Sequence, residues 1–63
     1  MNIDYDRLRD DLKDYFGSAI GIMPVFIMDV IRVENASEDE LLQIARENGF
    51  DISKYESYKS FRL

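Results

Sequence analysis

The chain has 63 residues, and its 13 acidic and 8 basic side chains give it a formal net charge of −5 at pH 7. It contains no cysteine and no histidine, which excludes a disulfide and leaves a zinc site without its commonest ligands. The length fits one domain over residues 1–63, and the acidic balance disfavours a nucleic-acid partner, because phosphate contacts need a basic surface.

A helix is predicted over about residues 4–16. Asp4 suits its N-cap, and Gly17 is expected to end it. The apolar side chains of this segment fall on one arc about 100° wide at 3.6 residues per turn. They are Tyr5, Leu8, Leu12, Tyr15 and Phe16.

A stretch of 13 residues without a charge, FGSAIGIMPVFIM, runs from Phe16 to Met28. It is shorter than the roughly 20 apolar residues of a membrane span, and the N-terminal sequence MNIDYD does not suit a secretory signal. We therefore expect a cytoplasmic protein with no membrane partner. Because the residue before a proline disfavours helical geometry, Pro24 divides the stretch. Residues 17–23 are interpreted as a connector, with room for one helical turn.

A second helix is predicted over about residues 24–34, with Pro24 at its first position, where a missing N–H costs nothing. Its apolar arc is roughly 200° wide, against about 100° for a usual surface helix. Asp29 and Arg32 mark the narrow polar edge, where a polar pair can fix the register of a dimer. Two small neighbouring helices cannot cover so wide an arc, so we expect an interface here. Its candidate residues are Met23, Phe26, Ile27, Met28, Asp29, Val30, Ile31 and Arg32.

A third helix is predicted over about residues 38–48. Ser37 and Glu40 match a capping box, and Gly49 suits the left-handed position that follows a helix. A second possible capping box, Ser53 to Glu56, would open a short C-terminal helix over about residues 53–60. Tyr55, Tyr58 and Phe61 recur there every third residue and form an aromatic stripe.

The predicted fold class is all-α, a small bundle of three main helices with a short C-terminal one. The segment VFIMDVIRV has the composition of a buried strand. It has no partner strand in the chain, however, and a lone strand cannot satisfy its backbone groups.

Catalysis has few candidate groups in this sequence. Without histidine or cysteine, the usual general base and thiol nucleophile are missing, and so short a chain cannot easily enclose a substrate. We therefore expect no enzymatic activity, no cofactor and no bound metal. The row Asp6, Asp10 and Asp14 could hold a hard cation, but it suits a solvated acidic face better. The basic and aromatic residues after Lys54 likewise suit core packing better than single-stranded nucleic acid.

Two resemblances to known proteins are carried by particular residues. The pattern Tyr15–Ala19, Pro24, Asp39–Leu41, Ala45 and Asn48–Asp51 resembles short uncharacterised bacterial helical proteins, which implies a helical fold and no known activity. Separately, Glu40–Leu42 and Ala45–Ser53 are similar to the end of nitrogen-fixation-type leader peptides. Those leaders guide modification enzymes to a peptide that follows, so this resemblance implies a recognition domain for such an enzyme.

Three functional hypotheses follow from the sequence. The leading one is a non-enzymatic helical protein that forms a homodimer through the helix at residues 24–34. The second is an acidic regulator that binds a larger basic protein, because unlike charges attract across an interface. The third is the leader-like recognition domain.

Overall fold

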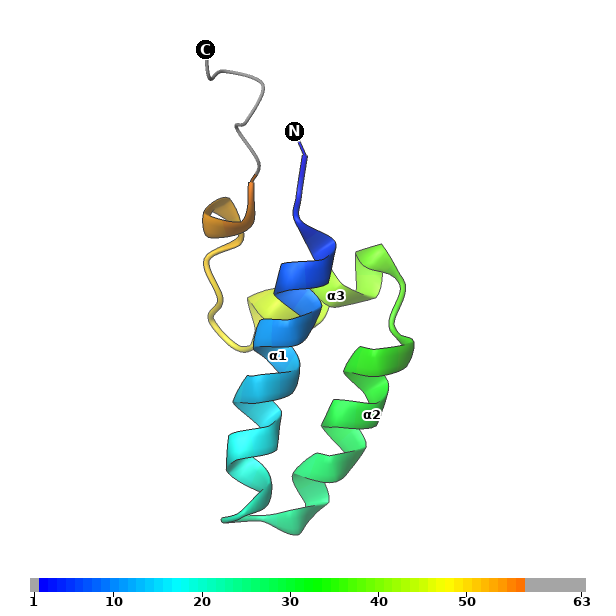
Figure 1. Cartoon of the computed structure of the whole chain (residues 1–63), viewed down its shortest axis with the longest axis vertical. Helices are drawn as coiled ribbons and strands as arrows, with labels where there is room; N and C mark the ends of the chain where they lie inside the picture. Colours follow the sequence, from blue (N-terminus) through cyan, green and yellow to red (C-terminus); the bar gives the residue numbers. More distant parts are fainter. Residues whose placement is uncertain (1, 57–63) are drawn as a thin grey trace.

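A computed structural model describes residues 2–56 of the chain. Within this range the chain forms three α-helices and two short 3-10 turns, which confirms the predicted all-α fold class (Figure 1). The extended contact at the two ends of the described chain is a single bridge between Ile3 and Glu56. The elements in chain order are α1 (Tyr5–Ile20), η1 (Pro24–Phe26), α2 (Ile27–Asn35), α3 (Glu38–Glu47) and η2 (Ile52–Tyr55).

Helix α1 begins where the sequence predicts and ends one turn later. The Asp4 carboxylate caps it by accepting a hydrogen bond of 3.1 Å from the backbone N–H of Arg7. The expectation that Gly17 ends the helix is wrong, because the helix runs through this residue to Ile20. The constraint that stops it comes instead from Pro24, since the residue before this proline is extended, with φ −135° and ψ 101°.

Helices α1 and α2 form an antiparallel hairpin, with η1 as the first turn of its second arm (Figure 1). Pro24 occupies the first position of that arm, as predicted, although the first three residues are 3-10 rather than α-helical. Helix α2 then ends at Asn35, within one residue of the predicted boundary.

Helix α3 has the ends that the sequence predicts. The Glu40 N–H donates to the Ser37 hydroxyl at 3.3 Å, and the Ser37 N–H donates to the Glu40 carboxylate at 3.2 Å. Gly49 follows the helix with φ 78°, the left-handed conformation that glycine adopts without strain. The Phe50 N–H then donates to the Ala45 carbonyl at 2.8 Å, which turns the chain back along α3.

The core lies where α3 crosses the hairpin beside the first half of α1 (Figure 1). Tyr15 belongs to the predicted apolar arc of the first helix but remains 49% exposed, although its ring meets that of Phe50 edge-on at a centroid distance of 5.3 Å. The buried residues are Leu8, Leu12, Phe16, Val33, Ala36, Leu41, Ile44, Ala45 and Tyr55.

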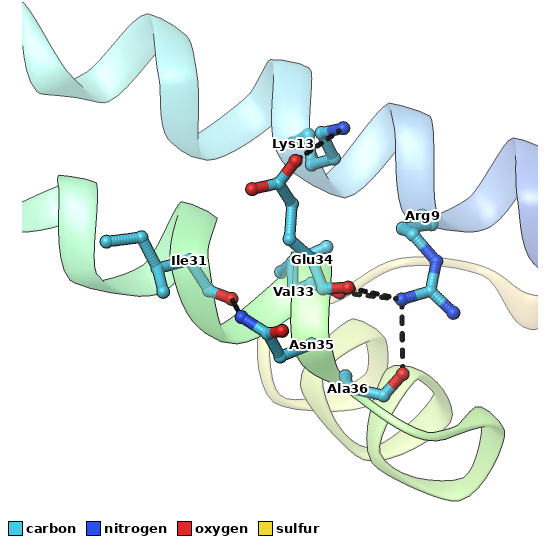
Figure 2. Close-up of polar contacts among 7 residues, drawn as sticks. All are labelled: Arg9, Lys13, Ile31, Val33, Glu34, Asn35 and Ala36. Atoms are coloured by element: carbon cyan, nitrogen blue, oxygen red, sulfur yellow. Dashed lines mark hydrogen bonds and ion pairs between the residues drawn. The ribbon is translucent and has the colours of Figure 1, made fainter.

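Polar contacts clasp the two arms of the hairpin at the core end (Figure 2). Arg9 donates through one guanidinium nitrogen to the carbonyls of Val33, Glu34 and Ala36 at 3.0, 3.0 and 3.1 Å. These carbonyls lie at the C-terminal end of α2, where helix carbonyls lack intrahelical partners and a positive charge is favoured. Lys13 adds an ion pair with Glu34 at 3.4 Å.

The C-terminal segment differs from the predicted helix over 53–60. Asp51, not Ser53, caps it, and the Asp51 carboxylate accepts from the Ser53 N–H at 3.0 Å. Residues 52–55 form a 3-10 turn, while positions 57–63, with Tyr58 and Phe61 of the aromatic stripe, lie outside the described residues. Tyr55 is buried as predicted, and its hydroxyl donates to the Asp11 carboxylate at 2.5 Å.

Candidate functional site

The half of the hairpin that contains its turn, residues 15–31, carries an unusual amount of exposed apolar surface, and we call it the hairpin end. In the part of the chain that the structure describes, all of the exposed large apolar side chains lie here. Single exposed apolar residues are ordinary, but a gathered set marks an interaction surface. The set is Tyr15, Ile22, Met23, Val25, Ile27, Met28 and Ile31.

The position of α3 explains this exposure. Leu41 and Ile44 of α3 share one buried cluster with Leu8 and Leu12 of α1, and no third helix continues alongside the turn of the hairpin (Figure 1). The apolar surface of the hairpin end is therefore covered where the two arms touch and, at Tyr15, by the ring of Phe50 at a centroid distance of 5.3 Å.

The structure divides the candidate interface residues into two groups. Phe26 and Val30 are half-buried and face inward, and Phe26 stacks on Phe16 with ring centroids 6.2 Å apart. These two residues therefore contribute to the hairpin itself. The exposed apolar members are Met23, Ile27, Met28 and Ile31.

The polar edge that the sequence predicts is not a free pair of charges. Arg32 approaches Glu47 of α3 at 4.0 Å, so it bridges α2 to α3. Asp29 is half-buried in the first turn of α2, where a negative charge is favoured.

Most of the exposed apolar residues of the second arm follow one helical row, and Val25 lies outside it. Pro24, Ile27, Met28 and Ile31 have the spacing i, i+3, i+4 and i+7, which brings side chains to one side of a helix. The inward residues Phe26, Val30 and Val33 follow a second row. The wide apolar arc predicted from the sequence is thus real, and the fold covers only one side of it.

A groove that the sequence analysis did not identify lies on the other flank of the hairpin end. It has a volume of about 460 Å³. Four of its residues recur on α1 and the turn after it at i, i+3, i+4 and i+7, a pattern that becomes visible once the helix continues past Gly17. The lining residues are Tyr15, Ser18, Ala19, Ile22, Phe26 and Asn48.

The titratable groups with perturbed acidity lie at the opposite end of the molecule. Burial raises the pKa of Tyr55 to about 12, and the hydrogen bond to Asp11 acts in the same direction. The hydrogen bonds from the Ser53 hydroxyl and N–H lower the pKa of the Asp51 carboxyl. Among the described residues, no group of three or more acidic side chains is arranged to hold a metal ion.

No helix within residues 2–56 is both long enough and apolar enough to cross a membrane. Comparison with protein-family models, with curated proteins and with solved structures found no match. The candidate site therefore rests on the geometry and charge of the hairpin end.

Proposed function

We propose that the protein is a non-enzymatic helical module that self-associates as a homodimer through the hairpin end. The observation that carries this proposal is that, within residues 2–56, the exposed large apolar side chains are confined to residues 15–31. Burying apolar surface contributes about 25 cal/mol per Å², and the monomer leaves this surface in water.

The charge pattern supports a partner surface that is itself uncharged. Residues 16–28 hold no charge, while residues 1–56 contain all 13 acidic and six of the eight basic residues, a formal charge of −7. Two copies that met through their charged parts would repel each other. Contact through the hairpin ends brings together the segments in which neither copy has a charge.

A matched pair of substitutions tests the proposal. Ile31→Glu adds one negative charge in the outer row of α2, and Gln43→Glu adds the same charge at an exposed position of α3. Both replace an exposed helical side chain with a good helix former. Sedimentation velocity at tens of micromolar should show a dimer for the unaltered chain and for Gln43→Glu, and a monomer for Ile31→Glu.

Two outcomes contradict this proposal. The first is an unaltered chain that stays monomeric at these concentrations. The second is a dimer that Ile31→Glu and Gln43→Glu weaken equally, because general charge repulsion would then explain the loss. Circular dichroism of both variants checks that the helices are retained.

The acidic regulator remains the alternative, and the charge of −7 over residues 1–56 favours it. It predicts binding to a basic protein surface that weakens as salt screens the charges. Apolar self-association should persist or strengthen in sulfate salts. The regulator would be favoured by a chain that stays monomeric and binds a basic probe such as polylysine with an affinity that falls as salt is added. The leader-like recognition domain stays a prediction from the resemblance of residues 40–53.

A further inference from the structure

Two residue rows lie side by side on the face of the hairpin opposite α3. Lys13, Gly17 and Gly21 follow one another at steps of four along α1, and neighbours at this spacing share a helix face. Ile27, Ile31 and Glu34 follow one another along α2 at steps of four and three, which also share a helix face. The Lys13–Glu34 ion pair of 3.4 Å joins the two rows at one end and fixes them next to each other (Figure 2).

The row on α1 is flat at Gly17 and Gly21, because glycine has no side chain, and we call it the flat glycine row. The fold of the monomer does not require glycine at either position. Gly17 lies inside α1 and Gly21 at its C-cap with φ −63°, so neither uses the left-handed conformation that favours glycine. A Cβ atom at Gly17 would meet nothing within 4 Å, and one at Gly21 would meet only the Ser18 carbonyl at 3.9 Å. Glycine in a helix is less stable than alanine, so these positions destabilise the monomer without an internal reason.

We infer that this face receives a second copy of the chain, with the flat glycine row of one copy against the projecting Ile27 and Ile31 of the other. This inference rests on the proposed function and names the part of the hairpin end that makes the contact. The glycines allow the backbone of α1 to come close to the second copy, because no side chain stands between them.

The second copy is the occupant that fits the shape and charge of this face. A two-fold dimer requires a surface that complements itself, and a projecting row beside a flat row does so when the second copy is turned about an axis along the hairpin. Between Gly17 and Met28 the face carries no charge for a charged partner to pair with. Toward the core end the face carries the paired Lys13 and Glu34 and also the exposed Asp10 and Asp14 of α1, so the contact is confined to its uncharged part.

Alanine substitutions at the glycines separate this inference from an ordinary structural role. Gly17→Ala together with Gly21→Ala should weaken the dimer at least tenfold in dissociation constant, measured by sedimentation equilibrium. The same pair of substitutions, made in the monomeric Ile31→Glu chain, should raise the melting temperature by about 4–8 °C, because alanine stabilises a helix. Gly17→Leu should weaken the dimer further, since its longer side chain reaches farther from α1.

Ser18→Ala is the matched control, because Ser18 adjoins Gly17 on the same helix but lines the groove on the other flank. It should leave the dissociation constant within twofold. A dimer that tolerates both glycine substitutions and Gly17→Leu would overturn this inference and leave the proposed self-association standing. An unaltered chain that remains monomeric would overturn both.

Discussion

The two ends of the α1–α2 hairpin are stabilised in different ways. At the core end, α3 covers the hairpin, and Arg9, Lys13 and the Tyr55–Asp11 hydrogen bond tie separate segments together. At the hairpin end, the same two helices continue without a third layer and without a charge between Phe16 and Met28. The apolar side chains of the core end are thus buried within the monomer, whereas many of those at the hairpin end remain exposed.

This difference shows how a short chain can combine folding with association. A chain of this length buries only about 60% of its unfolded surface, and the exposed apolar side chains of the hairpin end contribute little to folding of the monomer. The second copy that we propose explains why these exposed side chains lie together, because it would bury them. Substitutions at the core end should therefore lower the stability of the fold, and those at the hairpin end should change association.

The largest expected effect comes from the core. Leu12 is fully buried between α1 and its neighbours, and Leu12→Ala should lower the free energy of unfolding by about 2–5 kcal/mol. That is much of the total stability of so small a domain, which is roughly 3–9 kcal/mol at typical values per residue. Ile22→Ala, at a side chain that is 84% exposed, should change it by less than about 0.5 kcal/mol. Urea unfolding at one protein concentration measures both, and similar losses would contradict the division into two ends.

The next effect concerns the clasp at the end of α2. Arg9→Ala leaves the carbonyls of Val33, Glu34 and Ala36 without their shared donor, and it should cost about 1.5–3 kcal/mol, because this donor is charged. Lys13→Ala removes only an exposed ion pair, which should cost about 1 kcal/mol or less. Thermal unfolding followed by circular dichroism ranks the two variants, and an equal loss would argue against the role of Arg9.

Tyr55 makes the stability of the core end depend on alkaline pH. Its folded pKa is raised to about 12 from an ordinary value of 10, so the fold favours the protonated hydroxyl. This stabilisation is complete below pH 10 and is lost as the pH rises from 10 to 12. Tyr55→Phe should cost about 1 kcal/mol at neutral pH and should flatten the decline between pH 10 and 12. Urea midpoints along this range measure the difference, and parallel declines for both chains would exclude Tyr55 as the cause.

The smallest effect is expected at the capping box of α3. Ser37→Ala removes the acceptor for the Glu40 N–H and should cost about 1 kcal/mol or less, whereas Ser37→Asp keeps an acceptor and should be close to neutral. Thermal unfolding of the two variants is the measurement. If the alanine variant were as stable as the aspartate variant, water would be able to accept the hydrogen bond from the Glu40 N–H without any loss of stability.

Local signals explain most of what the sequence could predict. The Asp4 cap, the Ser37–Glu40 capping box and Gly49 each depend on residues within three or four positions of one another. The contacts of Arg9 with α2 join positions 24 to 27 residues apart, and Tyr55 and Asp11 are separated by 44. No local pattern specifies such pairs, so they became visible only in the fold.

The candidate site shows the same limit. The uncharged stretch and the wide apolar arc are visible in the sequence, but the arc could not be divided without knowing where α1 and α3 lie. The fold turns Phe26 and Val30 inward and leaves Ile27, Met28 and Ile31 outside. The sequence predicts that Gly17 ends the first helix, because glycine commonly follows a helix end, whereas the structure continues this helix to Ile20.

Sedimentation equilibrium of the unaltered chain tests the central claim most directly. The chain has a mass of 7.4 kDa, and the mass measured at tens of micromolar should be twice that value and should fall toward it on dilution. A mass that stays at 7.4 kDa over the whole concentration range would contradict the account, because the exposed surface of the hairpin end would then have no second copy to cover it.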